Sequence, residues 1–284
     1  MLLPATRFTL GVRREVLVAI RDMAGEAVLI AAGGRSILLQ IADPAIGHGV
    51  ARHSDFASRP LDRLRGTLTY VYAVTFGTPE ESAAATRTVN RAHRPVHGQG
   101  SADIPAYSAF TPELQLWVAA TLYDSAVTMH ELIYGPPSDA MADRVYQDYA
   151  ELGTALQVPP GMWPRDRAAF RLYWNERIGQ LRTDATTRAI AWQLLRPRSA
   201  PVWLRLGMPL GRLLTVGLLP PEVRALFELP WSDAAQRRFN RTVRLIAAVY
   251  PALPRRLRHW PKEHYLRSLR ASMKPARRSN RPLG

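Results

Sequence analysis

Apolar side chains recur along most of the chain three and four residues apart, which is the spacing of an amphipathic helix. The clearest run begins at the sequence TPE (residues 111–113), where a threonine cap and a first-turn proline are typical of a helix start, and reaches Gly135. The sequence TPEE at residues 78–81 repeats this start, and its helix is expected to end near Gly98. The same pattern predicts further helices at residues 60–76, 139–156, 165–181, 185–195, 221–229, 233–250 and 261–273.

Strand signals are rare by comparison. No two alternating segments are joined by an Asn-Gly or Asp-Gly turn, and no repeat of fixed period occurs. We therefore predict an all-α fold, a single globular domain of about eight to eleven helices. Residues 1–250 are expected to form the helical body, and residues 251–284 a basic C-terminal helix and tail. Proline clusters favour rigid connections between helices, although a weak domain boundary at residues 197–207 stays open.

The composition allows a packed core and excludes several kinds of site. Of the 284 residues, 47% are hydrophobic and none is cysteine. Disulfide frameworks, thiolate metal sites and cysteine nucleophiles are therefore excluded. The chain also lacks the HExxH, GxSxG, phosphate-loop and GxGxxG motifs, which removes most support for hydrolase and nucleotide-binding functions. Any metal site must rest on the seven histidines and on carboxylates.

The net charge of +15 has an ordinary explanation as well as a functional one. All basic residues except Lys262 and Lys274 are arginine, as codon bias in a GC-rich genome would produce. Ten basic residues and one acidic residue fall in residues 251–284, so this end is expected either to be solvated or to contact an anionic membrane. No DNA-reading motif accompanies it, so no specific nucleic-acid partner is expected.

The N-terminus does not resemble a signal peptide, because no basic segment precedes a long apolar run. The most apolar segment, residues 27–42, is interrupted by two glycines and an arginine and is shorter than a membrane-spanning helix. We expect a soluble, cytoplasmic protein. Peripheral contact with a membrane through the basic C-terminus is a further expectation.

Four of the seven histidines are His48, His53, His93 and His97. An unbroken helix would place His93 and His97 on one face, where they could hold one metal ion. Pro95 lies between them and is expected to kink or end the helix. A single histidine such as His93 suits either a core position or the axial position of a porphyrin, which needs one nitrogen and an apolar slot.

Arg63, Thr67 and Tyr70 fall on successive turns of the helix expected at residues 60–76. The arginine either extends to solvent from the helix start or is a buried cation beside a hydroxyl. In the second case it would hydrogen-bond dioxygen or pair with a porphyrin propionate. Spacing alone leaves both interpretations open.

Four segments in a fixed order resemble the haem-dependent oxygenase family typified by bacterial rubber oxygenase and the membrane-bound oxygenase of mycophenolic acid biosynthesis. They are SILLQIADPAIGHGVARHSDF, RPLDRLRGTLTYVYAVTFGTPEE, VNRAHRPVHG and YSAFTPELQLWVAATLYDSAV, and the resemblance runs from about residue 13 to about residue 269. It implies a helical domain enclosing one haem b. It also implies that dioxygen oxidises or cleaves a double bond in an apolar, isoprenoid-like substrate, with an electron donor that the sequence does not identify.

The resemblance assigns roles to particular residues. The H-x-x-V-x-G pattern at residues 93–98 implies that His93 is the axial metal ligand and that His97 is the reserve candidate. Arg63 and Thr67 match the distal side, where they would stabilise negative charge that develops on dioxygen. Gly66 stands where rubber oxygenase has a lysine, which implies an open or water-filled sixth position and argues against activity on rubber itself.

Further matches are less direct. Asp43 stands where many relatives have histidine, so its role stays open. His48, as a catalytic residue, and His53 are candidates to line the distal side, against a capping or surface role. Trp117, a candidate cofactor contact, matches the family pattern together with Tyr107 and Asp124, and all three also suit packing around the pocket.

Two interpretations from other classes stay open. In the first, the chain is a non-catalytic ligand carrier on the same fold. In the second, it is a basic-tail binder of anionic membrane or nucleic acid. Haem bound without oxygen chemistry would indicate the carrier, and affinity that falls with salt and needs residues beyond 251 would indicate the tail binder.

Overall fold

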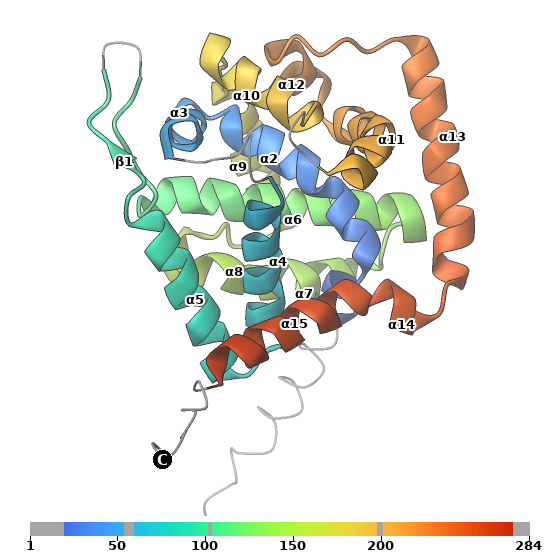
Figure 1. Cartoon of the computed structure of the whole chain (residues 1–284), viewed down its shortest axis with the longest axis horizontal. Coiled ribbons are helices and arrows are strands. Elements are labelled where there is room, and N and C mark those ends of the chain that lie inside the picture. The colour runs from blue at the N-terminus through green and yellow to red at the C-terminus, as the bar shows by residue number, and fades with distance from the viewer. Residues whose placement is uncertain (1–19, 54–59, 102–103, 198–200, 275–284) are drawn as a thin grey trace, which may run out of the picture.

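The computed structural model describes residues 20–53, 60–101, 104–197 and 201–274 (Figure 1). Within these ranges the chain forms fourteen α-helices, a few short 3-10 helices and one two-residue hairpin. The predicted all-α, single-domain fold is confirmed. The helices outnumber the eight to eleven expected, because four-residue pieces such as α8 and α14 form in segments that the sequence pattern assigned to a longer helix or to a loop.

The elements follow one another in three stretches. The first contains η1 (Ala27–Ala32), α2 (Gly33–Ile41), α3 (Pro44–His53), α4 (Pro60–Phe76) and α5 (Pro79–His93). The second contains β1 (His97–Gly98), β2 (Tyr107–Ser108), α6 (Pro112–Tyr134), α7 (Asp139–Tyr149), α8 (Glu151–Thr154), η2 (Pro160–Met162), α9 (Arg167–Gln180) and α10 (Ala185–Leu195). The third contains α11 (Val202–Leu218), α12 (Pro221–Leu226), α13 (Asp233–Val249), η3 (Tyr250–Ala252), α14 (Arg255–Arg258) and α15 (Trp260–Met273).

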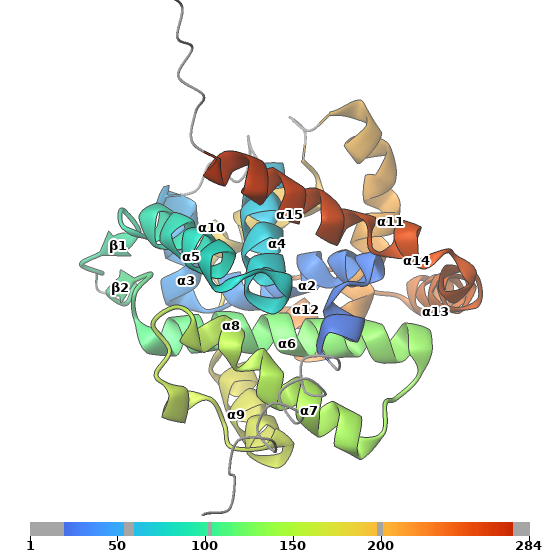
Figure 2. The same ribbon diagram turned by 90° about the horizontal axis from the view of Figure 1, so that it is seen from below.

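Helix α6 runs through the middle of the molecule (Figures 1 and 2). It starts at the predicted TPE cap and ends at Gly135, whose φ of +82° is a conformation that glycine adopts without strain. Trp117, Thr121 and Met129, spread along its length, are fully buried. The helix is buried on several sides because α2 and α4 lie to one side of it and α7 and α9 to the other (Figure 2).

Local signals placed several helices at the predicted residues. α4 and α10 have the expected bounds, and α5 begins with a complete capping box in which Thr78 and Glu81 bond each other's backbone N–H groups. The α5 helix ends at His93 and not near Gly98, because Pro95 cannot continue the backbone hydrogen bonds. The sequence pattern did not predict α11, which contains Gly207, Pro209 and Gly211.

The C-terminal helix α15 packs across α4 and α5 (Figure 1). Its Leu266 and Leu269 are buried, and Arg270 Nε lies 2.6 Å from Glu81 Oε1 on α5. The expected division of the chain at residue 250 stays a prediction.

No single helix in the described ranges has both the length and the apolar character to cross a bilayer, and only the pair formed by residues 27–41 and 44–53, bent by 106°, meets both criteria together.

Candidate functional site

The N-terminal end of α4 and the C-terminal end of α5 meet at one corner of the molecule. The two helices are joined by only two residues and pack along each other, so they run antiparallel. Arg63 is the fourth residue of α4 and His93 is the last residue of α5, so both lie at the same end of the pair. The positive charge of Arg63 acts on the His93 ring, which places the two side chains within electrostatic reach of each other.

His93 is half-buried, and its ring nitrogen Nδ1 is buried without a hydrogen-bond partner among the described residues. The edge of the Phe110 ring faces it, with 6.3 Å between ring centroids. Burial, and then the charge of Arg63, lower the pKa of His93 below its ordinary value of 6.5. The ring is therefore neutral at neutral pH and keeps a lone pair that can bind a metal ion.

The chain turns sharply after His93, and this turn separates it from His97. The amide of Val96 donates to the carbonyl of His93 at 2.9 Å, and the chain then enters β1, which pairs with β2. His97 is exposed, and its carbonyl oxygen lies 3.2 Å from Nε2 of His53. His93 and His97 therefore do not share a helical face, as the position of Pro95 predicted. Among the described residues no group of three or more His, Cys, Asp or Glu could hold a metal ion.

Arg63 and Thr67 are both half-buried and lie one helical turn apart on α4. Burial lowers the pKa of the Arg63 guanidinium, but a guanidinium stays charged throughout the physiological range. A Cβ atom added to the neighbouring Gly66 would meet nothing within 4 Å. The structure therefore has open space at the position where the resemblance places a lysine in rubber oxygenase.

His48 lies on α3 and is only 5% exposed. Its Nε2 is 2.6 Å from Oδ2 of Asp184, whose other oxygen accepts the backbone N–H of Thr187 at the start of α10. Burial alone raises the pKa of Asp184, but these bonds from Thr187 and His48 outweigh it and lower the pKa. His48 thus ties α3 to α10, and its role on the distal side stays a prediction.

Trp117 is fully buried in the core. Its Nε1 donates to the carbonyl of Leu39 at 3.2 Å, and its ring packs on Trp174 with 5.2 Å between centroids. The guanidinium of Arg177 lies 5.3 Å above the ring. These contacts satisfy the indole, so packing accounts for Trp117, and its contact with a cofactor stays a prediction.

The contacts of Asp43, whose role the sequence left open, are structural. One carboxylate oxygen accepts the backbone N–H groups of Ala45 at 3.0 Å and Ile46 at 3.2 Å, which starts α3. The other oxygen lies 2.6 Å from Nη2 of Arg177 on α9. Asp43 therefore fixes the start of the helix that carries His48.

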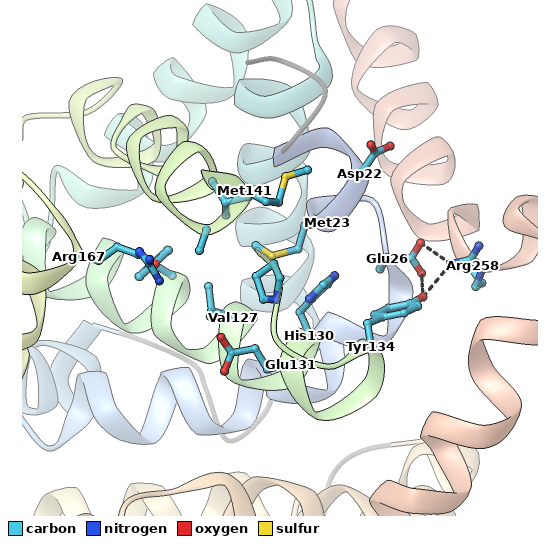
Figure 3. A pocket seen from close by; sticks show the side chains of 14 residues that line it. Asp22, Met23, Glu26, Val127, His130, Glu131, Tyr134, Met141, Arg167 and Arg258 are labelled. Carbon is cyan, nitrogen blue, oxygen red and sulfur yellow. Dashed lines mark hydrogen bonds and ion pairs between the residues drawn. The ribbon is translucent and has the colours of Figure 1, made fainter. Parts of the chain in front are cut away.

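Sequence reasoning missed a cavity of about 280 Å³ near the other end of α6 (Figure 3). His130 and Tyr134 on α6 line it, with 4.9 Å between their ring centroids, together with Met23 and Glu26. Burial lowers the pKa of His130, and the charge of Glu26 opposes that shift. His130 lies 18 residues beyond Pro112, or about 27 Å along the helix. The spacing of His130 and Tyr134 by four residues was the available signal.

A buried carboxylate closes one end of this cavity. Glu26 is 5% exposed, and its two oxygens lie 2.6 Å from Arg258 Nη1, 3.1 Å from His259 Nε2 and 2.8 Å from the hydroxyl of Tyr134 (Figure 3). Burial alone raises the pKa of Glu26, but the hydrogen bonds from Tyr134 and His259 and the charge of Arg258 outweigh it. The net effect lowers the pKa, so Glu26 is ionised at neutral pH.

Comparison with known proteins places these residues in a family. Residues 20–248, which include Arg63, Thr67 and His93, match the family described as "ER-bound oxygenase mpaB/B'/Rubber oxygenase, catalytic domain". Similar proteins occur in Mycobacterium tuberculosis (Rv2237) and Mycobacterium bovis (Mb2261), and both are described as uncharacterized. Each is 39% identical over 248 residues, which are 86% of this chain and 97% of the relative.

No solved structure gives a significant match. The family match covers most of the chain and includes the corner formed by α4 and α5. The protein therefore belongs to the mpaB/rubber oxygenase catalytic-domain family, a family of oxygenases.

Proposed function

We propose that this protein is a haem b-dependent oxygenase in which His93 is the axial ligand. The observation that carries the proposal is the buried, unpartnered ring nitrogen of His93 within reach of the Arg63 charge. Buried polar atoms are nearly always satisfied, so an unpartnered imidazole nitrogen at a helix end is available to a ligand from outside the chain. A single neutral imidazole is the donor that haem iron requires, and this chain has no cysteine that could replace it.

The residues present fit such a group. Phe110 supplies an apolar neighbour for the ring, and Gly66, exposed on α4, adds no side chain that would fill the site. Within the described ranges no cluster of histidines and carboxylates competes for a metal ion, which favours a macrocycle with one protein ligand over a metal held by side chains alone. When bound, haem supplies a redox-active iron that makes dioxygen reactive.

The side chains have distinct tasks in this account. Burial keeps His93 deprotonated, so its lone pair is available as a ligand at neutral pH. Arg63 brings a permanent positive charge to the site, which stabilises negative charge that develops on the reacting oxygen atoms or on a propionate. The Thr67 hydroxyl, one turn further along α4, adds a hydrogen-bond donor to this account.

The substrate class rests on the family and not on a shaped pocket. Family membership supports an apolar molecule with an electron-rich carbon–carbon double bond. Cleavage of that bond by one dioxygen molecule gives two carbonyl groups, each of which takes one of the two oxygen atoms. The reaction therefore consumes no further reductant once the cofactor is in its reduced form. The donor that first reduces the cofactor comes from outside this chain.

A haem titration followed by absorption spectroscopy tests the proposal. The wild-type protein should develop a Soret band with one equivalent of haem. His93→Ala should lose or strongly alter this band, whereas the matched variant His97→Ala should keep it, because His97 is exposed on β1. A band that depends on His97 would move the ligand, and no band in the wild-type protein would remove the haem proposal.

Arg63 is tested separately from haem binding. Arg63→Ala should keep the Soret band but oxidise faster in air after reduction, because a positive charge near the reacting oxygen is lost. Arg65→Ala is the control, since Arg65 is exposed on the same helix. Equal oxidation rates for both variants would remove Arg63 from the distal role. Haem binding without dioxygen consumption in the presence of reductant and an alkene would instead support the carrier function.

A further inference from the structure

The two halves of α11 differ sharply in burial. Its C-terminal half packs into the body, where Leu214, Thr215, Val216 and Leu218 are all buried. A Cβ atom on Gly34 of α2 would come within 2.2 Å of Thr215, and one on Gly217 within 2.3 Å of the Phe239 ring on α13, so these contacts are close. This half is an anchor that holds the helix rigidly on the protein.

The N-terminal half of α11 projects from the body. Figure 2 shows it rising away from the other helices, beyond α15. Val202, Leu206 and Leu210 are 67%, 78% and 50% exposed. They are four residues apart, so they form one stripe along the helix. Large apolar side chains that are this exposed and aligned mark a binding surface and not chance exposure.

Positive charge accompanies this apolar stripe. Arg205 is exposed, directly precedes Leu206 and lies three residues after Val202, so it borders the stripe formed by Val202, Leu206 and Leu210. Residues 185–221 contain five arginines and no aspartate or glutamate. A projecting helix whose apolar face lies beside arginine, in a segment without acidic residues, is typical of segments that lie in the interface of an anionic membrane.

We propose that the projecting half of α11 docks on an anionic lipid membrane. The leucines enter the boundary between headgroups and acyl chains, and Arg205 contacts the lipid phosphates. A second copy of this chain is a poorer occupant, because residues 185–221 offer no carboxylate to neutralise the facing arginines. Nucleic acid would engage the arginines but leave the leucines in water. This proposal does not depend on haem binding.

The proposal predicts which vesicles bind the full-length protein in a sedimentation assay. Vesicles of phosphatidylcholine mixed with phosphatidylserine should sediment it, those of phosphatidylcholine alone should not, and added salt should weaken the binding. Leu206→Glu/Leu210→Glu should weaken binding about tenfold or more, because both side chains leave the lipid and two negative charges are added. The matched control is Leu172→Glu, since Leu172 is 74% exposed on α9, on the opposite side of the molecule (Figure 2).

A second variant separates charge from apolar contact. Arg205→Glu should weaken binding to the phosphatidylserine vesicles about fivefold or more, whereas Arg171→Glu, an exposed arginine on α9, should not. Absence of wild-type binding, or equal binding to both kinds of vesicle, would overturn the proposal. So would wild-type binding by the leucine variant, which would assign the membrane contact to the basic C-terminus. If the leucine variant loses self-association but binds vesicles as the wild type does, α11 is an interface between copies and the proposal fails.

Discussion

Three histidines of this molecule, His48, His259 and His93, are withdrawn from solvent in two different ways. His48 and His259 are 5% and 6% exposed, and each has a carboxylate partner, Asp184 at 2.6 Å and Glu26 at 3.1 Å. His93 is half-buried and has a buried nitrogen without a partner among the described residues. The first two join elements that are far apart in the sequence. The third keeps a lone pair free, which is what a ligand requires.

The difference is one of free energy as much as geometry. A paired ring between packed helices compensates for the water that it lost, so it contributes to stability. A buried nitrogen without a partner costs stability, and such a cost persists where it serves a function. Removing a paired group should therefore destabilise the fold and leave the cofactor, whereas removing His93 should do the reverse.

The largest expected effect is at Glu26. Glu26→Ala leaves Arg258 and His259 without their buried counter-charge, so the free energy of unfolding should fall by about 3 kcal/mol. The matched control is Glu131→Ala, because Glu131 lines the same cavity but is exposed, and it should leave stability unchanged. Denaturant unfolding measures both. The Soret band of Glu26→Ala should stay as in the wild type, and its loss would break the division between the two groups.

The same carboxylate gives a pH dependence. Its pKa in the folded protein is below its ordinary value of 4.5, so it contributes stability above that pH and loses it as pH falls through the folded pKa. The difference in unfolding free energy between the wild type and Glu26→Gln should therefore be constant near pH 7 and shrink below about pH 4.5. A difference that does not change down to pH 3 would contradict the lowered pKa.

A smaller loss is expected at His48. His48→Gln removes the contact between α3 and α10 but leaves Asp184 as the cap of α10, so stability should fall by about 1–2 kcal/mol. His53→Gln, on the exposed end of the same helix, serves as the control and should have no effect. Thermal unfolding checks this. If His48→Gln keeps its stability but loses dioxygen consumption, His48 belongs to the distal site and not to the structural group.

The smallest effect concerns Asp148, whose Oδ2 is buried without a partner, although the backbone of Ile20 hydrogen-bonds the carboxylate. Burial, and then the charge of Glu151, raise its pKa from 3.8 to about 6. Its ionised form is disfavoured in the fold, so Asp148→Asn should raise stability at pH 7 by about 1 kcal/mol. The gain should appear as pH rises from 3.8 through 6 and vanish in acid. A loss of stability at pH 7 would show that the hydrogen bond from the Ile20 backbone outweighs the cost of burying the carboxylate.

The sequence predicted the helices whose signals are local. The side-chain caps at Thr78 and Asp184 and the first-turn proline Pro112 act within four residues, so α5, α10 and α6 start where expected. Helix α11 was missed because Gly207 and Pro209 normally interrupt helices, whereas packing of its C-terminal half against α2 and α13 maintains this one.

The candidate site could be predicted only in part. Resemblance to the family singled out His93 and Arg63, and the antiparallel α4–α5 pair brings them to one corner. The pairing of His48 with Asp184 joins residues 136 positions apart, and that of His259 with Glu26 joins residues 233 apart. No local pattern records such pairs, so sequence reasoning could not separate a structural histidine from a ligand.

The most direct test of the central claim is ligand rescue at His93. The apoprotein of His93→Gly should fold with nearly wild-type stability, and added haem should give no Soret band of the bound form. Imidazole should then restore this band by replacing the lost ring. The control His130→Gly should bind haem without imidazole. His130 lies about 27 Å along α6 from Pro112, whereas His93 contacts Phe110, two residues before Pro112. A wild-type Soret band in His93→Gly without imidazole would contradict the account.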